Sequence, residues 1–373
     1  MYEKGRAWIE LSRNRLAHNV EEIQKILPAR CRLMPALKAN AYGHGAVQIG
    51  LLLQNLGIRD CCVASAEEGI QLRRAGFSGQ ILVLGYTHPE LFPELCRNRL
   101  TQTVVDFPYA CRLSRYGKPV KVHVGIDTGM RRLGERSEDI ENILKIWSLD
   151  HLEITGVFSH LCAADGRTEA EKAFTCRQIQ RFCGVIQTLR SNGIHHFETH
   201  LQGSYGLLNY PDLQFDYARV GIALYGTFSS PEDRTAVQPD LRPVLSLKSR
   251  LECVKHLHPG EPAGYGLAYT APEEMRIAAV SIGYGDGIPR SLSGKGAVLV
   301  RGVRAPVVGR VCMDQLLIDV SCAPGAAAGD EAVLIGSSGS EEITAAEMAA
   351  DAGTISNEIL SRLGSRPERV LTE

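Results

Sequence analysis

The chain has 373 residues and a formal net charge of -1, from 41 Lys and Arg against 42 Asp and Glu. This balance argues against nucleic acid or anionic lipid as the main partner, and a hydrophobic share of 44% with 22% charged residues argues against global disorder. No apolar run of about 18 residues occurs, so we expect no membrane contact from this segment itself. We expect a cytoplasmic location, either free or as the cytoplasmic part of a membrane protein whose N-terminal membrane region has been removed.

Cysteine and histidine usage points to a reduced protein without a metal. The eleven Cys are odd in number, and no Cys-x-x-Cys pair occurs, although Cys61 and Cys62 are adjacent. Reduced, mostly buried thiols are therefore expected rather than a disulfide framework. The histidines at 195, 196 and 200 lack a supporting acidic or thiolate set, so no metal site is predicted.

Short apolar runs alternate with helical patterns between Cys31 and Gly226. Helices are expected over 66–76 and 169–193, the second ending at a glycine. The predicted strands lie at 32–37, 61–65, 81–85, 101–105, 120–126, 154–160, 197–203 and 217–226. Alternating strands and helices indicate a parallel sheet, and eight units favour an α/β fold with a closed (β/α)8 TIM barrel. An open doubly wound sheet is the competing architecture.

The pattern changes after Gly226. Residues 229–243 carry three Pro and several charges, which is typical of a linker. Beyond the linker, strands are expected within 244–257, 275–287, 296–311, 315–320 and 330–336, with one later helix near 344–352. We therefore predict a barrel domain over 1–240 and a C-terminal β-rich domain over 241–373.

Lys38 follows the first predicted strand, in the segment ALKANAYGHG. In a barrel, that end of the strand faces the active site. A desolvated lysine there has a lowered pKa and a nucleophilic amine, whereas the alternative is an ordinary surface lysine. The glycine-rich turn with Tyr42 that follows favours Schiff-base chemistry.

A second cluster follows the seventh and eighth predicted strands. Gly203-Ser204 and Gly221-Ile222 lie where barrels commonly bind phosphate through backbone N–H groups and a hydroxyl. Arg219 adds a permanent cation near the same mouth. A lysine on the first strand together with a phosphate cradle suits pyridoxal 5'-phosphate.

Several long motifs extend this interpretation over nearly the whole chain. They are ALKANAYGHG, IDTGMRRLG, FSHL, ARVGIALYG, AGYGLAY, SIGYGDGIPR and GRVCMDQ, in this order. Together they resemble the alanine racemase family. The resemblance implies a pyridoxal-phosphate enzyme of fold type III, with a barrel, a C-terminal β domain and a head-to-tail homodimer. Each site would combine one subunit's barrel with the other's β domain.

The resemblance also assigns roles to individual residues. Lys38 would hold the cofactor and act as one acid/base, and Tyr265 would reach in from the partner subunit as the other. Racemisation needs this two-sided arrangement, because a proton leaves one face of the planar substrate carbon and returns on the opposite face. The assigned cofactor residues are Lys38, Tyr42, His160, Ser204, Arg219, Gly221 and Ile222. The assigned substrate residues are Arg132, Tyr284, Met313 and Asn357.

Two positions depart from the family pattern. Gly125 stands where many relatives carry a carbamylated lysine that steadies the substrate-binding arginine. Asn357 stands where most alanine racemases carry a tyrosine, and in this it resembles the racemase domain of membrane-bound serine/alanine racemases of vancomycin-resistance clusters. A short amide opens volume and adds both a donor and an acceptor, so a serine side chain could enter.

We therefore expect an isomerase that interconverts L- and D-serine and L- and D-alanine, and that supplies D-amino acids for peptidoglycan precursors. Three alternatives stay open. They are an ordinary alanine racemase that prefers alanine, a fold-type III amino-acid decarboxylase, and a non-catalytic cofactor carrier.

Overall fold

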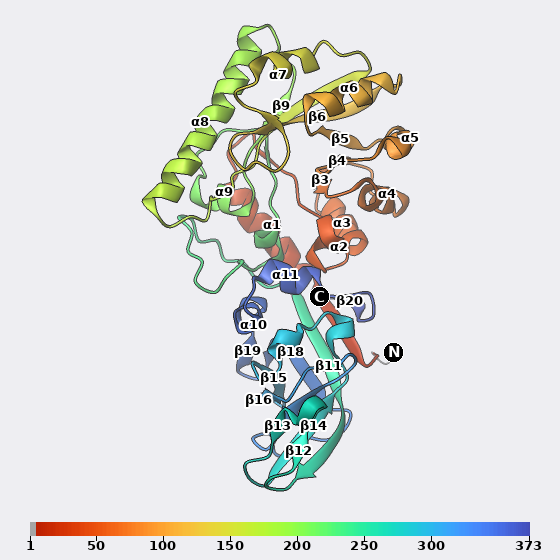
Figure 1. The fold of residues 1–373 in the computed structure, drawn as a ribbon, viewed down its shortest axis with the longest axis vertical. Helices are drawn as coiled ribbons and strands as arrows, with labels where there is room; N and C mark the ends of the chain where they lie inside the picture. The colour runs from red at the N-terminus through yellow and green to blue at the C-terminus, as the bar shows by residue number, and fades with distance from the viewer. Residues whose placement is uncertain (1–4) are drawn as a thin grey trace.

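The computed structural model describes residues 5–373 and contains two parts arranged along its long axis (Figure 1). Helices surround a parallel sheet in the first part, and mostly antiparallel strands form the second. The first part follows the sequence from α1 to η2, and the second is built mainly from residues beyond 244.

The first part is a closed barrel. Its strands are β2 (Arg32–Leu33), β3 (Asp60–Val63), β4 (Gln80–Val83), β5 (Thr101–Val104), β6 (Val120–Asp127), β8 (Leu152–Phe158), β9 (Glu198–His200) and β10 (Tyr217–Ala218). They pair in parallel in the order β2-β10-β9-β8-β6-β5-β4-β3. A parallel bridge between Ala36 and Cys62 joins the two ends of this path. The predicted barrel is therefore confirmed, and the open doubly wound sheet is not the fold.

The helices and helical turns of the first part cover the outside of the barrel or lie at its mouth. They are α1 (Arg13–Ile26), α2 (Lys38–Tyr42), α3 (Ala46–Asn55), α4 (Ala66–Arg74), α5 (Phe92–Arg97), α6 (Phe107–Arg115), α7 (Ile140–Ile146), α8 (Glu169–Ser191) and α9 (Ser204–Asn209), with short 3-10 turns η1 (Pro89–Leu91) and η2 (Ile222–Tyr225). The short strand β7 (Glu135–Arg136) pairs with β6. Thr168 caps the first turn of α8, and Gly193, at φ +82°, follows its end. Gly193 lies at the end predicted for this helix, and the Thr168 cap adds a start signal that the prediction did not include.

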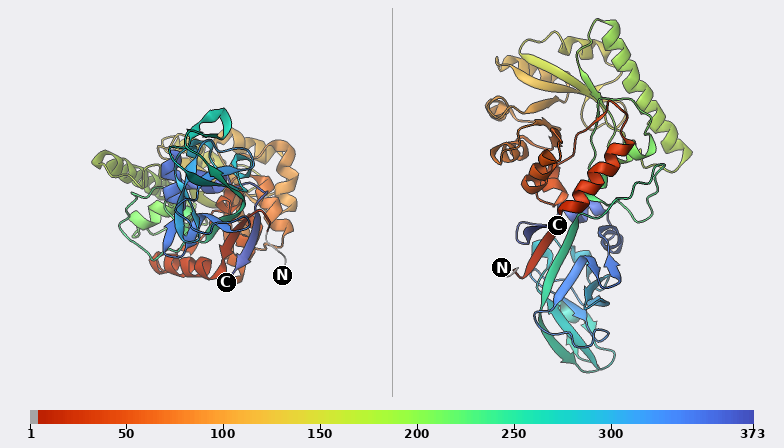
Figure 2. Two further views of the ribbon diagram at one scale, coloured as in Figure 1. Left: turned by 90° about the horizontal axis from the view of Figure 1, so that it is seen from below. Right: turned by 180° about the vertical axis from the view of Figure 1, so that it is seen from behind.

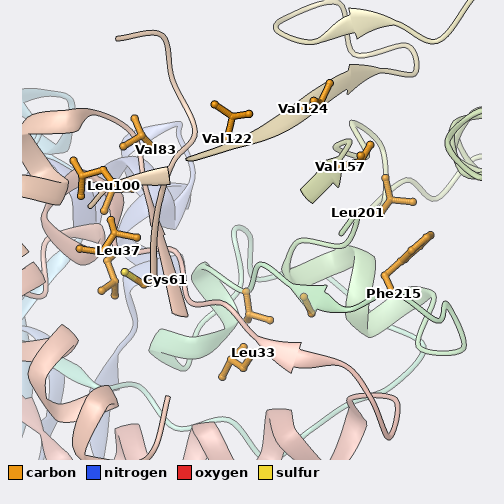
Figure 3. Packing of buried hydrophobic residues seen from close by; sticks show 14 of the residues in the cluster. Leu33, Leu37, Cys61, Val83, Leu100, Val122, Val124, Val157, Leu201 and Phe215 are labelled. Carbon is orange, nitrogen blue, oxygen red and sulfur yellow. The ribbon is translucent and has the colours of Figure 1, made fainter. Parts of the chain in front are cut away.

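The barrel core consists of apolar side chains from the strands and the inner helix faces. Figure 3 shows Leu33, Val83 and Val157 among them, and each is at most 5% exposed. Burying one such side chain contributes roughly 1.5–3 kcal/mol. The rigid core fixes the strand ends, and these ends carry the candidate site.

The second part is a nine-stranded sheet with the order β19-β18-β15-β16-β17-β14-β11-β1-β20. Its strands are β1 (Ala7–Ser12), β11 (Leu245–Leu257), β14 (Met275–Val280), β15 (Ala297–Val300), β16 (Val303–Val308), β17 (Leu316–Asp319), β18 (Glu331–Ser338), β19 (Glu341–Ile343) and β20 (Glu368–Thr372). A small hairpin of β12 (Pro262–Ala263) and β13 (Tyr269–Thr270) lies apart, with the turns η3 (Tyr265–Leu267), η4 (Tyr284–Asp286) and η5 (Arg290–Leu292).

The first strand of the chain belongs to this second sheet. β1 pairs antiparallel with β11 and parallel with β20, so both ends of the described chain lie here (Figure 2). The division at residues 240 and 241 stays a prediction, and the pairing of residues 7–12 adds an N-terminal strand to the β-rich part. Residues 229–243 contain no helix or strand, which agrees with their prediction as a linker.

Two helices follow β19, whereas the sequence patterns predicted one. The expected helix is α10 (Ala345–Ala352), and the additional one is α11 (Ser356–Ser361). α11 lies between the two parts of the molecule (Figure 1). Its Leu360 carbonyl packs against Gly43, where an added Cβ would lie only 1.9 Å from that oxygen. α11 thus touches the turn that follows Lys38. Within residues 5–373, the longest helices are too short or too polar to span a bilayer.

Candidate active site

A cavity of about 300 Å³ opens at the carboxyl ends of the barrel strands. This is the end at which barrels place their catalytic residues. Of the residues singled out in the sequence, the cavity is lined by Lys38, Tyr42, Gly125, Arg132, His160, Ser204, Arg219, Gly221, Ile222 and Asn357. Positions separated by more than 300 residues along the chain therefore converge at one mouth.

Lys38 begins a turn immediately after the barrel closes. The N–H of Leu37 donates to the Cys62 carbonyl at 2.8 Å, and the chain then reverses direction. Lys38 itself is half-buried and lines the cavity. The amine is thus carried by a backbone anchored to the neighbouring strand.

The loops after β9 and β10 form a cradle on one side of the cavity. Ser204 Oγ accepts hydrogen bonds from the N–H groups of Gly221 at 3.0 Å and Ala223 at 3.3 Å. A Cβ on Gly221 would lie 2.5 Å from Tyr42 Oη, so a larger residue here would displace the phenol. Burial raises the pKa of Tyr42, which keeps its hydroxyl protonated. The first N–H groups of α9 and η2 lack intrahelical acceptors and lie in these loops.

Arg219 lies in the wall of the cavity with its guanidinium buried. It contacts the Ser159 carbonyl at 2.7 Å, His200 Nδ1 at 2.6 Å and His160 Nδ1 at 3.2 Å. Burial lowers the pKa of Arg219 to about 10, which still leaves it protonated at neutral pH. The site therefore contains a fixed positive charge.

This cation determines the tautomers of the histidines around it. An arginine only donates, so Nδ1 of His160 and of His200 must accept, and each ring then carries its proton on Nε2. His200 Nε2 lies 2.8 Å from His123 Nδ1, so the protonated Nε2 of His200 donates to Nδ1 of His123. Burial lowers the pKa of His160 and of His123 to about 3, so both are neutral near pH 7.

Arg132 lies on the loop that follows β6, with its guanidinium exposed. It makes no hydrogen bond or ion pair with any residue in the described range 5–373. A guanidinium without a protein partner at the rim of a cavity is suited to bind a carboxylate in a bidentate manner.

The Arg132 loop is supported through its backbone. Asp127 Oδ1 accepts from the N–H groups of Gly129 at 2.8 Å and Arg131 at 3.0 Å. Buried Gln178 donates to Thr128 Oγ1 at 3.2 Å and so ties the loop to α8. These contacts hold the backbone of the Arg132 loop, to which Gly125 can add no side-chain contact.

Asn357 contributes an unsatisfied acceptor. Its Oδ1 is buried and has no hydrogen-bond partner among the described residues. The start of its helix is fixed, because Ser356 N donates to the Ser229 carbonyl at 2.9 Å. A buried acceptor beside a cavity can accept a hydrogen bond from a donor bound in that cavity.

Three predicted site residues lie elsewhere. Tyr265 is 70% exposed, Met313 54% and Tyr284 42%, and all three belong to the β-rich part. The N–H of Tyr284 donates to Cys312 O at 2.9 Å, which places this turn beside Met313. None of the three lines the cavity at the barrel mouth. One copy of the chain therefore does not bring Tyr265 to Lys38.

The structure adds residues that the sequence patterns did not reveal. Cys62 lines the cavity as a buried thiol whose pKa burial raises to about 11. The sequence presents His200 only as one of a group of histidines, and in the structure it is the partner of Arg219. Its one signal in the sequence is its place within the seventh predicted strand, 197–203. Glu68, on the first turn of α4, binds the backbone next to Lys38.

Comparison with known proteins places this geometry in a family. The N-terminal domain of the alanine racemases matches residues 11–229, and their C-terminal domain matches residues 244–371. An amino-acid racemase of Enterococcus faecalis is 42% identical over 98% of this chain and 51% of its own length. A serine/alanine racemase of Enterococcus gallinarum is 40% identical over 97% of this chain and 51% of its own. The chain thus spans about half the length of these curated relatives.

Solved structures agree over the entire length. An alanine racemase of Clostridium difficile 630 superposes with a TM-score of 0.91 at 34% identity, and covers 99% of this chain and 96% of its own. The alanine racemase of Bacillus anthracis with bound L-Ala-P gives a TM-score of 0.92 at 32% identity, over 99% and 95% of the two chains. The chain belongs to the alanine racemase family, whose enzymes depend on pyridoxal phosphate.

Proposed function

We propose that this chain racemises serine as well as alanine, with pyridoxal phosphate bound at the barrel mouth. The observation that carries the serine assignment is the buried, unpartnered Oδ1 of Asn357 in the cavity that holds Lys38. An acceptor without a donor is satisfied by a substrate that brings a hydroxyl, and alanine brings none.

The residues around the cavity fit pyridoxal phosphate. Because Gly221 has no Cβ, the Tyr42 hydroxyl can lie directly against this loop, where a Cβ would come within 2.5 Å of it. Ser204, Ile222 and the backbone of these loops offer neutral donors for a phosphate. Lys38 offers the amine. Arg219 offers a protonated donor for the pyridine nitrogen, with His160 held beside it.

The proposed mechanism moves one proton across the substrate Cα. The bound cofactor delocalises the electron pair that remains on this carbon when its proton leaves. Lys38 Nζ acts on one face of the carbon, and Tyr265 Oη of a second copy acts on the other. For each turnover one group accepts a proton from the carbon and the opposite group returns one, which inverts the configuration.

Other residues orient the substrate, and Arg219 sets the protonation of the cofactor's pyridine nitrogen. Arg132 binds its carboxylate, with the Met313 backbone and Tyr284 of the second copy closing the entrance. Arg219 keeps its proton and would donate it in a hydrogen bond to the pyridine nitrogen of a bound cofactor, which would leave the cofactor a weaker electron acceptor and would disfavour transamination. In the serine complex, the side-chain hydroxyl donates to Asn357 Oδ1.

A homodimer completes this proposal, because Tyr265 and Lys38 lie on different parts of one chain. The exposure of Tyr265, Leu267 and Met313, large apolar side chains on one part of the molecule, supports a contact with a second copy. Mixing Lys38→Ala with Tyr265→Ala subunits tests it. Each variant alone should be nearly inactive, whereas a mixed dimer regains one complete site of its two. Absence of any recovery in proven mixed dimers would exclude the shared site.

The direct test is a parallel turnover assay on L-serine and L-alanine with added pyridoxal phosphate, in which D-isomers are separated by chiral chromatography. We expect both D-serine and D-alanine to form, as precursors suited to peptidoglycan. Formation of D-alanine alone would refute the serine assignment. Release of carbon dioxide without a D-amino acid would indicate a decarboxylase instead.

A further inference from the structure

The turn that carries Lys38 has a rare backbone conformation. Ala39, Asn40, Ala41 and Tyr42 all have φ between 52° and 55°, which is left-handed helix built from residues other than glycine. L-residues disfavour this conformation at every step, so such a turn persists only where surrounding contacts hold it. Lys38 lies at its start, and the contacts that hold the turn therefore determine where its amine lies.

Glu68 holds the first residue of this turn. Its Oε1 accepts the N–H of Ala39 at 2.7 Å, directly after Lys38. Its Oε2 accepts the N–H of Ala64 at 2.7 Å, directly after strand β3. One carboxylate therefore joins the beginning of the strained turn to the end of a barrel strand. Charge-assisted bonds of this kind are stronger than those between neutral groups.

The local sequence predicts a different task for Glu68. Ser65 and Glu68 form the S-x-x-E pattern of a capping box, in which the glutamate returns to the N–H of the capping serine. Thr168 and Glu171 in this chain form that box completely, with Glu171 bonded to the Thr168 N–H at 2.9 Å. Glu68 instead binds Ala39 and Ala64. One of its oxygens therefore binds the Lys38 turn, and the other binds the residue before the capping serine instead of the serine itself.

The other contacts hold the far end of the turn. Asn40 Oδ1 accepts the N–H of Ala46 at 2.8 Å, and Arg369 Nε donates to the Gly43 carbonyl at 3.0 Å. In the part of the chain that the structure describes, Glu68 is the one side chain hydrogen-bonded to Ala39. Glu68 is therefore the side-chain anchor of the near end, beside the backbone hydrogen bond from the Leu37 N–H to the Cys62 carbonyl.

We propose that Glu68 is a positioning residue for Lys38, which anchors the start of the left-handed turn to β3 and so fixes the amine against the substrate Cα. The proposal rests on the proposed function for its effect on turnover. The anchoring of the turn to β3 does not depend on which reaction the chain catalyses.

Glu68→Gln is the sharpest test, with Glu67→Gln as the matched control. Glutamine keeps one acceptor oxygen but turns an amide donor toward the second N–H, so one of the two bonds is lost. Glu67 precedes Glu68 on the same helix, is exposed and bonds to none of the described residues, so its replacement removes the same charge without touching the turn. The full chain is used in all cases, with and without pyridoxal phosphate.

Three readouts test the proposal. Amide hydrogen exchange over residues 39–42 of the cofactor-free chain should become faster in Glu68→Gln and stay at the wild-type rate in Glu67→Gln. In the loaded enzyme, kcat should fall by up to about 10²-fold with a smaller change in KM, as expected when a catalytic group is misplaced by about 1 Å. The pH at which the visible absorption of the lysine-bound cofactor changes should also shift.

The outcomes separate this proposal from the proposed function. Unchanged exchange over residues 39–42 in Glu68→Gln overturns the positioning role, whatever the wild-type chain turns over. Faster exchange with an unchanged kcat and an unchanged absorption profile overturns it too, because Glu68 is then only structural. Faster exchange with a shifted absorption profile supports it even if the wild-type enzyme fails to racemise serine or alanine. Should Glu68→Gln not fold, Glu68→Asp gives the second variant, since its shorter side chain cannot span both N–H groups.

Discussion

Replacement of Asn357 by leucine tests the serine assignment most directly. Leucine has a similar size but no polar atom, so the cavity keeps its shape and loses the buried Oδ1 that has no partner. A serine hydroxyl placed there would stay unpaired, and an unsatisfied buried hydroxyl costs about 1–3 kcal/mol. We therefore expect the ratio of kcat/KM for L-serine over L-alanine to fall by about 5- to 150-fold.

The alanine reaction of the same variant is the internal control. Alanine brings no hydroxyl, so its kcat/KM should be unchanged or higher, since an orphaned acceptor no longer has to be buried beside it. Initial rates are measured by chiral chromatography at saturating pyridoxal phosphate. Asn357→Tyr should lower the same ratio by filling the volume. A ratio that stays within about twofold of wild type in both variants would refute the role of Asn357.

Further predictions address the lysine, the turn and the buried histidines. Lys38→Ala should abolish the visible absorption of the covalently bound cofactor, and a retained band would place the attachment elsewhere. Gly43→Ala should lower the free energy of unfolding in urea by more than Gly57→Ala. Both have positive φ, which costs alanine about 1–2 kcal/mol, but only a Cβ at Gly43 meets the Leu360 carbonyl; equal losses would contradict the clash. Burial lowers the pKa of His123 to about 3, so below pH 6.5 the unfolded chain binds the extra proton and stability falls with falling pH, by about 1.4 kcal/mol per pH unit for this group. His123→Asn should flatten this slope between pH 6 and 4, whereas replacement of exposed His195 should leave it unchanged.

The barrel could be predicted because its signals are local. Each strand is a short apolar run between turns. The alternation of strands with helices indicates a parallel sheet, and a count of eight units indicates that it closes into a barrel. A barrel strand lies within or beside each of the eight predicted segments, although β2 and β10 have only two residues each and residues 222–225 form a 3-10 turn. The bridge between Ala36 and Cys62 closes the barrel. The position of Lys38 at the mouth follows from the same pattern, since it comes directly after the first strand.

The contacts that shape the site could not be predicted in this way. His200 reaches Arg219 only because β9 and β10 are neighbours in the barrel. The S-x-x-E pattern at Glu68 predicts a helix cap, and a long-range contact with Ala39 overrides it. α11 has six residues, too few for a clear helical period, and its packing on Gly43 is tertiary. Local patterns therefore predicted the scaffold, and contacts across the barrel determine the site.

The two ends of the site share one support. Arg369, on the last strand, donates to the Gly43 carbonyl of the Lys38 turn and to Leu363 O at the end of α11. The helix that carries Asn357 and the turn that carries Lys38 are thus fixed to the same guanidinium. A substitution at position 357 can then change which side chain the cavity accepts while the amine stays in place. This shared anchor is compatible with the proposed turnover of both serine and alanine by one lysine.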